Sequence, residues 1–497
     1  MELAEILQSV LVPSCLLLIL IGVVIGNVFG CIPGLNGPIA VALILPVTFS
    51  LDIIPSMCLI MGIYMGSVTG GLVSAILLKI PGTAASVATT FDGYPMTLQG
   101  RATEALSIGA FASVFGGIFS AIFLMLLAPL LAQMAVGFGP WEYFGTALLS
   151  LSLVCSMMSG KRLKAFIAMT IGVLLTMVGM SPVDGVAARY TLGISSLESG
   201  FELVVVIIGI FALPEVLHSL GGIAEKAVPS KVEKRWFYVP SRSSIKKNLG
   251  VMLQGSVLGT AIGILPGMGG GAAGLISYEQ AKRTSKTPEK FGTGFDAGLY
   301  SCESANNATT GGALVPMLAL GVPGDTVTAI IMGAIALQGI TPGPLLSMQQ
   351  PVIFKTIIFI VFVANIFMFL FQITTIRFMA KIISIPKYLL FPIVCVFCAI
   401  GAISINNSIF DLMYLMFFAI VGYVLEKNGY PLSPFVLAFV LGSIVEENLR
   451  RSIIYYSDFA GCMSQVSIGT LFVILAVLAP IVLTALDIRK EKKKAGV

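Results

Sequence analysis

Two breaks in long apolar sequence constrain this chain more than any other feature. The first is Gly30-Cys-Ile-Pro-Gly-Leu-Asn-Gly-Pro38, and the second is Gly263-Ile-Leu-Pro-Gly-Met-Gly-Gly270. Proline lacks an amide donor and glycine leaves the backbone unshielded, so neither segment can face lipid directly. Such backbone is tolerated at membrane depth where protein surrounds it or where it lines a polar cavity. Matched breaks in two halves of a chain are typical of a transporter's binding site.

The sequence around the breaks indicates a helical membrane protein. Of 497 residues, 57% are hydrophobic and only 11% are charged, whereas soluble domains carry about 25% charged residues. Apolar windows that are long enough to cross a bilayer as helices recur from end to end, so we predict an all-α polytopic membrane protein with roughly 10–14 membrane segments. Some of these segments would be Gly/Pro-broken helices or re-entrant hairpins. The net charge of +5 comes from short loops, which is the pattern of topology signals and not of nucleic-acid binding.

The breaks belong to an internal repeat that covers most of the chain. Four ordered matches pair Pro33 with Pro266, Pro81 with Pro323, Leu98 with Leu337, and Gly172 with Gly422. Their offsets stay between 233 and 250 residues, which indicates a duplicated chain. We therefore predict a first transmembrane repeat over 1–222, a basic linker over 223–247, a second repeat over 248–488 and a basic tail over 489–497.

Basic residues predict how the two repeats are oriented. The loop with Lys161, Arg162 and Lys164 in the first repeat is basic, whereas its counterpart from Asn406 to Asp411 is not. Because basic loops stay in the cytoplasm, the two repeats would cross the membrane in opposite senses, as an inverted repeat. The linker and the C-terminus would be cytoplasmic, and the N-terminus would be periplasmic.

The apolar windows also predict where the helices lie. In the first repeat we expect a helix over 12–30, an apolar return to 50, a helix to 79, a second break over 80–100, and spans over 103–133, 141–158, 163–180 and 201–220. The second repeat follows the same order from 248. A short extra span over Pro431–Val445 would bring the C-terminus to the cytoplasmic side.

The densest polar stretch at membrane depth runs from Tyr300 to Thr326. Ionisable residues inside a bilayer cost about 2.5–3.5 kcal/mol each, so they usually face a polar pathway or a partner. The candidates for binding a coupling cation are Glu303, Asn306, Asn307, Thr309, Thr310 and Asp325. Their oxygens suit a hard cation, with Na⁺ at Glu303, Asn307 and Asp325, and a carboxylate could instead carry a proton. The alternative is that Glu303 caps a helix or pairs with a basic residue.

The breaks themselves suit an anion. Helix N-termini that follow Pro-Gly turns direct free amides and positive dipole ends toward one place, and they can hold carboxylates without arginine. The predicted substrate-binding residues are Pro33, Gly34, Leu35, Asn36, Gly37, Pro81, Gly82, Thr83, Pro266, Gly267, Gly269, Gly270, Pro323, Gly324 and Thr326. Turns of purely structural use are the alternative. Lys79 and Arg101 flank the second break, either as helpers for the anion or as interfacial anchors.

Some function classes find no support in the sequence. It contains no Gly-x-x-x-x-Gly-Lys-Ser/Thr phosphate loop, so we do not expect ATP hydrolysis by this chain. It also contains no His-Glu-x-x-His or Gly-x-Ser-x-Gly motif, and we expect neither an enzyme nor a cofactor.

The same residues resemble the large membrane subunit of the tripartite tricarboxylate transporter family, the TctA type. The resemblance covers nearly the whole chain and rests on Gly30-x-x-Pro-Gly34, Leu78-Lys-Ile-Pro-Gly-Thr83, Asp92-Gly-Tyr-Pro95, Gly100, Gly263-x-x-Pro-Gly-Met-Gly269, Glu303-Ser-Ala-Asn-Asn307 and Gly321-Val-Pro-Gly324. It implies import of small carboxylates such as citrate, driven by a Na⁺ or H⁺ gradient. It also implies a bacterial inner membrane, a small four-helix membrane subunit and a periplasmic substrate-binding protein as partners.

The function predicted from these observations is cation-coupled carboxylate uptake by secondary active transport, with alternating access. One rival is a channel-like anion pore without ion coupling, which would use the breaks as a filter. The other is a membrane-embedded assembly or sensor subunit that does not transport. The sequence leaves open which carboxylate is carried, which cation is coupled, and whether two copies pair as a homodimer.

Overall fold

The computed structural model describes residues 2–158, 160–183, 188–220, 238–267, 269–383, 387–406 and 408–494. These residues form two compact units. The first comprises Met1–Ala132, Glu215–Ile264 and Met268–Gly401, and the second comprises Gln133–Pro214, Leu265–Gly267 and Ala402–Val497. Each unit contains segments from both predicted repeats, so the units do not coincide with the repeats. The repeat boundaries therefore stay a prediction.

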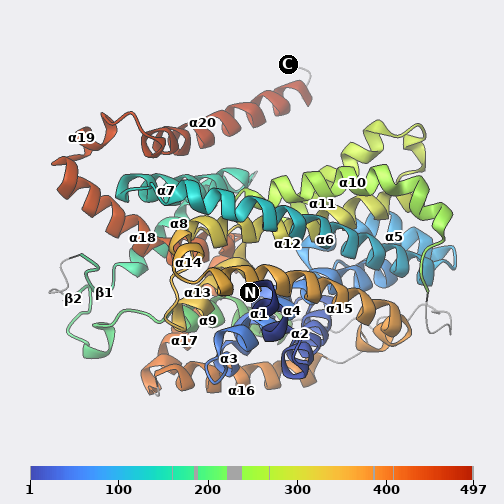
Figure 1. Ribbon diagram of the computed structural model, residues 1–497, viewed down its shortest axis with the longest axis horizontal. Coiled ribbons are helices and arrows are strands. Elements are labelled where there is room, and N and C mark those ends of the chain that lie inside the picture. The colour runs from blue at the N-terminus through green and yellow to red at the C-terminus, as the bar shows by residue number, and fades with distance from the viewer. Residues whose placement is uncertain are drawn as a thin grey trace. The chain divides into compact units, whose positions relative to one another are not determined.

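The first unit contains helices from both predicted repeats, which Figure 1 colours by residue number. Its elements are α1 (Glu2–Val10), α2 (Pro13–Cys31), α3 (Gly37–Thr48), α4 (Ile53–Leu78), η1 (Ala84–Ser86), α5 (Thr89–Leu98), most of α6 (Ala102–Ala135), α10 (Arg242–Ile264), α11 (Gly269–Thr284), η3 (Pro288–Lys290), α12 (Asp296–Leu320), α13 (Thr326–Leu337), α14 (Pro344–Gln349), α15 (Pro351–Ile383) and most of α16 (Lys387–Asn406). Along the chain, a helix, a Pro-Gly turn, a second helix, a deeply buried helix and another Pro-Gly turn occur twice, although Pro266 and Gly267 themselves belong to the second unit. The inverted relation between the two copies stays a prediction.

The second unit consists of helices and one small hairpin. Its elements are α7 (Pro140–Met157), α8 (Arg162–Thr176), β1 (Gly179–Met180), β2 (Ala188–Arg189), η2 (Ser195–Leu197), most of α9 (Leu203–Leu220), α17 (Ile409–Lys427), α18 (Leu432–Tyr456), α19 (Phe459–Met463) and α20 (Ile468–Lys494). The two strands pair antiparallel, with Gly179 opposite Arg189. Arg189 forms an ion pair with Glu446 of α18, which ties the hairpin to that helix.

Glycines bring α2 and α4 into direct backbone contact. They recur every four residues, as Gly22, Gly26 and Gly30 on α2 and as Gly62, Gly66 and Gly70 on α4. A Cβ atom built on any of the six would lie 2.2–2.5 Å from a backbone oxygen of the opposite helix. Small residues at this spacing let membrane helices approach closely enough for extensive van der Waals contact. We call this contact the glycine seam of the first half.

The second half repeats this packing between α10 and α12. The spacing is the same on α10, with Gly255, Gly259 and Gly263, and a Cβ on Gly259 would lie 2.1 Å from the Ala305 carbonyl oxygen of α12. On α12 only Gly312 takes a comparable place, because a Cβ added to it would lie 2.5 Å from the Thr260 carbonyl oxygen of α10. The remainder of the α12 face consists of small polar and alanine residues, so this seam holds polar side chains at its centre.

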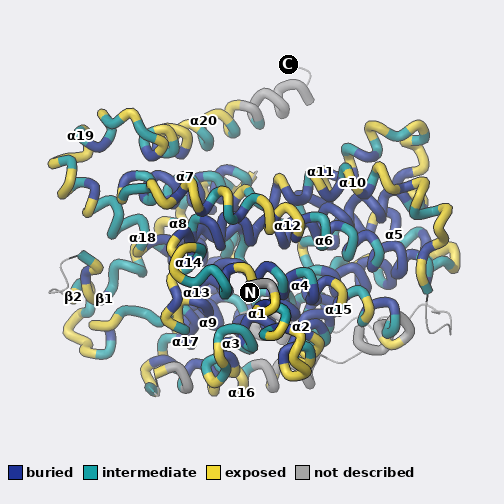
Figure 2. Tube along the Cα trace, in the orientation of Figure 1, coloured by how far each residue is buried: buried dark blue, intermediate teal, exposed yellow. Residues whose placement is uncertain are grey.

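Seven helices in the described part of the chain are long and apolar enough to cross a membrane. They are Pro13–Cys31, Ile53–Leu78, Ala102–Ala135, Pro351–Thr375, Ile409–Lys427, Leu432–Tyr456 and Ile468–Ala485. The prediction of an all-α polytopic membrane protein is confirmed. The helix α12 is not among the seven, and its sequence is rich in polar residues. It is buried almost throughout, as Figure 2 shows, so its polar side chains face protein. The total number of membrane segments stays a prediction.

Most predicted helices begin and end within a few residues of the observed ones. Two differences stand out. The second break, predicted over 80–100, contains η1 and α5, and Thr89, Thr90 and Asp92 of α5 are buried. The helix α10 begins at Arg242, inside the predicted linker 223–247. Residues 221–237 of that linker and 495–497 of the predicted tail lie outside the described residues.

Candidate functional site

The helix α12 carries the central part of the candidate site. Every residue from Ala297 to Ala319 is buried, although the stretch contains a carboxylate, two asparagines and several hydroxyls. The helix ends at Gly321, whose backbone is left-handed at φ 70° and so favours glycine. The Pro-Gly turn Pro323-Gly324 follows directly. A Cβ on Gly324 would lie 2.5 Å from the Cα of Ala313, so the chain returns tightly onto α12.

Glu303 lies at the centre of this helix with its side chain fully enclosed. Its carboxylate accepts a hydrogen bond from the Thr89 hydroxyl of α5 and another from the Ser113 hydroxyl of α6, at 3.2 Å. No ion pair to Glu303 is present among the residues that the structure describes. The groups that face this carboxylate are therefore neutral hydroxyl donors from the first half. Because neutral donors do not compensate the charge of an ionised carboxylate, a cation or a proton would have to do so.

Asn307 extends the same network. Its Nδ2 donates to Ser113 Oγ at 2.8 Å, and its Oδ1 accepts a hydrogen bond from Thr69 of α4 at 2.8 Å. Glu303 and Asn307 thus meet through a shared serine. We call Thr69, Thr89, Ser113, Glu303 and Asn307 the carboxylate network.

Asp325 belongs to a different set of hydrogen bonds. It caps α13, because its Oδ1 accepts from the Thr328 amide at 2.7 Å, and its Oδ2 accepts from the Tyr64 hydroxyl of α4 at 2.7 Å. Both carboxylate oxygens are therefore engaged away from the carboxylate network. The predicted role of Asp325 in cation binding is untested, and its structural role as a helix cap is clear.

Asn306 is 1% exposed, and its side-chain Oδ1 has no hydrogen-bond partner among the described residues. Its amide nitrogen, the end that can donate, faces the Glu303 carboxylate of the same helix. Its Oδ1 faces Gly270 at the start of α11, where an added Cβ would lie 2.2 Å away. The Thr309 and Thr310 hydroxyls instead donate to carbonyl oxygens of their own helix, at 2.6 and 2.7 Å.

The turns of the first half contain a left-handed glycine and capping hydrogen bonds. Gly34 has φ 98°, and Asn36 caps α3 by accepting from the Ile39 amide at 3.1 Å. At the next turn, the Thr83 amide donates to Ser86 Oγ at 3.3 Å, as the Asp325 amide donates to Thr328 Oγ1 at 2.8 Å. The same capping hydrogen bond thus follows the Pro-Gly turns after α4 and after α12.

The other predicted substrate-binding residues are distributed over both units. Leu35 is buried, Gly37 begins α3 beside Ser67, and Thr326 begins α13. Gly82 lies against α2, where an added Cβ would be 2.2 Å from the Gly30 oxygen. Gly269 and Gly270 begin α11 in the first unit, whereas Pro266 and Gly267 belong to the second unit, where Gly267 lies against Val154. Substrate binding by these residues stays a proposal.

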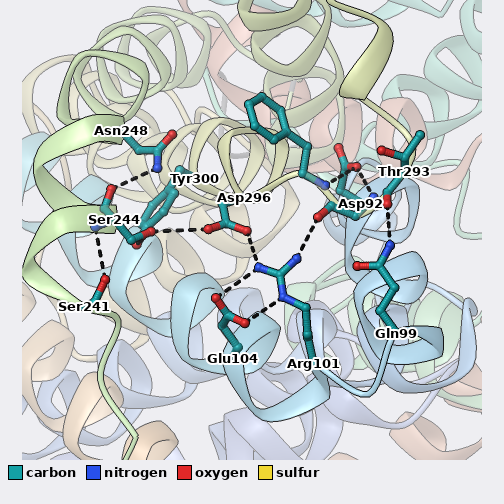
Figure 3. Close-up of polar contacts among 12 residues, drawn as sticks. Asp92, Gln99, Arg101, Glu104, Ser241, Ser244, Asn248, Thr293, Asp296 and Tyr300 are labelled. Atoms are coloured by element: carbon teal, nitrogen blue, oxygen red, sulfur yellow. Dashed lines mark hydrogen bonds and ion pairs between the residues drawn. The ribbon is translucent and has the colours of Figure 1, made fainter. Parts of the chain in front are cut away.

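A second polar cluster, which the sequence did not predict, joins the first half to the loop before α12 (Figure 3). The buried Asp92 of α5 accepts hydrogen bonds from the Gly292, Gly294 and Phe295 amides at 2.8–2.9 Å. Tyr278 of α11 donates to its other oxygen at 2.8 Å. Burial raises the pKa of the Asp92 carboxyl, and these four hydrogen bonds oppose the shift.

Arg101 completes this cluster. Its guanidinium forms ion pairs at 2.7 Å with Glu104 and with Asp296, the first residue of α12, and it donates to the Gly294 oxygen (Figure 3). Arg101 therefore fixes the start of α12. The sequence offered two signals for the cluster, the carboxylate Asp92 in the second break and Arg101 beside it, where an anion-binding or anchoring role was expected. It offered none for the Gly292–Phe295 loop as the partner of Asp92.

Side chains that could hold a metal ion are few. In the described ranges, no three residues of the His, Cys, Asp and Glu types lie close enough together to form a metal site. The oxygens of the carboxylate network are of the kind that hard monovalent cations accept.

Fold and site together define a polytopic helical membrane protein with an enclosed, cation-compatible carboxylate. Comparison with known families matches residues 16–437 to the tripartite tricarboxylate transporter TctA family, and the chain belongs to that family. It is 36% identical over 448 residues to an uncharacterized 52.8 kDa protein in the TAR-I ttuC' 3' region of Agrobacterium vitis. This alignment covers 90% of this chain and 88% of that protein. An uncharacterized protein in the TAR-II ttuC' 3' region of the same organism is 39% identical over 230 residues, and that alignment covers 45% of this chain and 95% of that protein. No solved structure matches.

Proposed function

We propose that this chain is the large membrane subunit of a binding-protein-dependent secondary transporter that imports small organic di- or tricarboxylates by symport with Na⁺ or H⁺. The observation that carries the proposal is the carboxylate network. A fully enclosed carboxylate on α12 receives neutral donors from α5 and α6, in a chain of the TctA family. An unbalanced charge at membrane depth is expensive, so it is retained where a cation or proton pathway needs it.

The chemistry of the network suits either coupling ion. A Na⁺ would be held by oxygens of Glu303, Asn307 and neighbouring hydroxyls, and a proton would be held by the Glu303 carboxylate itself. In both cases the bound cation neutralises Glu303. A carboxylate substrate could then approach the glycine-rich turns without repulsion from that charge. This sequence of events would couple anion uptake to the cation gradient.

The family also supports proposals about the assembly. The small four-helix membrane subunit and a periplasmic substrate-binding protein would complete the transporter in a bacterial inner membrane. The N-terminus would be periplasmic and the C-terminus cytoplasmic. Movement of one bundle of helices against the others would give alternating access, and a homodimer is compatible with this arrangement.

The test is uptake of labelled citrate and related carboxylates into proteoliposomes that hold this chain, its small subunit and a loaded binding protein. A Na⁺ gradient and a pH gradient would be imposed separately. We expect uptake to follow one of the two gradients and to be lost in Glu303→Gln. The matched control is Glu289→Gln, which changes an exposed glutamate of η3 and should leave uptake unchanged.

Two results would contradict the proposal in different ways. Uptake that responds to neither gradient would favour the channel-like pore. Absence of uptake with any carboxylate, from protein shown to be folded and assembled, would favour the assembly or sensor subunit.

A further inference from the structure

We infer that Asn306 and the N-terminus of α11 form a subsite for a 2-hydroxycarboxylate group, so that this chain distinguishes hydroxylated carboxylates from their unhydroxylated analogues. The inference rests on the proposed function and specifies the substrate class of its site.

The first observation is the unsatisfied amide oxygen of Asn306. This oxygen lacks a hydrogen-bond partner among the described residues, although the side chain is 1% exposed and its nitrogen faces Glu303. Polar groups that are buried in this way are usually paired. Asn307, the next residue, uses both ends of its amide within the protein, so the contrast is local to Asn306. An amide oxygen that the fold leaves without a donor in the interior is available to a ligand.

The second observation is the element that Asn306 faces. Its Oδ1 lies against Gly270, in the first turn of α11, and an added Cβ on Gly270 would also come within 3.2 Å of Ala85 in η1. The first amides of a helix have no partner within that helix, and the dipole there favours an anion. A Cβ on Gly269 would meet no described atom within 4 Å, so the start of α11 is open on that side.

The chemistry of the two groups defines the ligand. The first amides of α11 are donors, and a carboxylate supplies the acceptors that they lack. Asn306 Oδ1 is an acceptor and requires a donor from the ligand, which a carboxylate cannot provide. A hydroxyl on the adjacent carbon provides it. The combination of carboxylate and neighbouring hydroxyl therefore satisfies the α11 amides and the Asn306 oxygen at once.

Charges near the subsite set the conditions of binding. Glu303 lies beside Asn306 and would repel the anion while ionised. Asp92 and Asp325 are held in their own hydrogen-bond sets, by Tyr278 and by Tyr64. Binding should therefore be measured both with saturating Na⁺ and at low pH, because either condition can neutralise Glu303.

The experiment compares ligands that differ by one hydroxyl. Isothermal titration of the purified full chain in nanodiscs would measure the affinity for L-malate against succinate, and for citrate against tricarballylate. We expect each hydroxylated ligand to bind about three- to tenfold more tightly, the factor that one neutral hydrogen bond supplies. Asn306→Ala should reduce both ratios to about one.

Two further variants make the test specific. Asn306→Asp keeps an acceptor oxygen for the hydroxyl, removes the donor and adds a negative charge, so it should weaken all four ligands while the ratios persist. It also keeps the size of the side chain, should Asn306→Ala fail to fold. The matched control is Asn365→Ala on α15, which removes another buried asparagine with an unpartnered Oδ1 and should leave the ratios unchanged.

The outcomes separate this inference from the proposed function. Equal affinity of the wild-type chain for malate and succinate would overturn the subsite, and so would ratios that survive Asn306→Ala. Gradient-driven uptake could still hold in either case. If none of the four ligands binds under either condition, the subsite is overturned, and the uptake assay decides the proposed function independently.

Discussion

The helices α4 and α12 occupy corresponding places in the two predicted repeats, and their polar side chains play opposite roles in hydrogen bonding. Both are buried over nearly their whole length, and both lead into a Pro-Gly turn. On α4 the Tyr64 and Thr69 hydroxyls act as donors, to Asp325 and to Asn307. On α12 Glu303 and the Asn307 oxygen act as acceptors. In this pair of helices the donors thus lie on α4, and the charged acceptor lies on α12.

The two predicted repeats share some features and differ in others. The glycine spacing and the motif after each Pro-Gly turn are present in both, and they set how closely the backbones approach. The side chains between them differ. As a result, neither half completes the carboxylate network alone, since the Glu303 carboxylate relies on Thr89 and Ser113 from the other half.

The largest expected effect concerns the glycine seams, which the two halves share. Gly26→Ala and Gly259→Ala should each destabilise the protein by about 3 kcal/mol, because the new methyl group would lie near 2.2 and 2.1 Å from a carbonyl oxygen of the partner helix. The measurement is the thermal unfolding midpoint of the detergent-solubilised protein, followed by size-exclusion chromatography. Similar losses in both halves would show that the seams are equivalent.

The control for this comparison lies on the same helix. A Cβ at Gly250 of α10 would meet no described atom within 4 Å, so Gly250→Ala should be neutral or slightly stabilising, because alanine favours a helix. A midpoint for Gly259→Ala that matches that of Gly250→Ala would contradict close contact in the second seam.

The next effect concerns Asp92, whose hydrogen bonds join the first half to the loop before α12. Asp92→Ala would leave the Gly292, Gly294 and Phe295 amides without their acceptor, at a cost of about 2 kcal/mol. Hydrogen exchange of the 285–295 loop should increase together with the loss of stability. Gln99→Ala, which removes a single exposed hydrogen bond to Thr293, should change neither by much. Unchanged exchange in Asp92→Ala would show that the loop is held by other contacts.

A smaller effect is expected for the bond that crosses from α4 to α13. Tyr64→Phe removes the hydroxyl that donates to Asp325. It should lower the free energy of unfolding by about 1.5 kcal/mol, the lower end of the values for hydrogen bonds to carboxylates. A double-mutant cycle with Asp325→Asn, which keeps an N-cap side chain, would isolate this pair. Additive losses in the cycle would mean that the two residues act independently.

Much of the fold could be predicted from the sequence, because length and apolarity determine where a helix crosses a bilayer. The predicted helix over 12–30 is α2, Pro13–Cys31, and the predicted span over 103–133 is α6, Ala102–Ala135. The glycine spacing on α2 and α10 was visible in the sequence, but its use as a helix contact depends on which helices become neighbours. The helix α5 within the predicted second break could not be foreseen, because the burial of its polar residues depends on that packing.

The candidate site was predictable only in part, for a similar reason. Glu303 and Asn307 were identified because polar residues at membrane depth are rare and costly. Their partners Thr89 and Ser113 lie 214 and 190 residues away in the sequence, and a single hydroxyl in an apolar helix gives no signal. Nor can a sequence show that Asn307 is satisfied while Asn306 is not.

The smallest expected effect compares Asn36 with Asn306, two asparagines predicted to bind ligands. Asn36 uses its side-chain oxygen to cap α3, so Asn36→Ala should cost about 1 kcal/mol, and Asn36→Ser, which keeps a capping oxygen, should restore most of it. Carboxylate affinity should stay within about twofold in Asn36→Ser, because this asparagine is already occupied within the protein. Thermal unfolding and titration with malate measure the two effects separately. Loss of malate binding in Asn36→Ser at full stability would move the ligand toward the first break and away from Asn306.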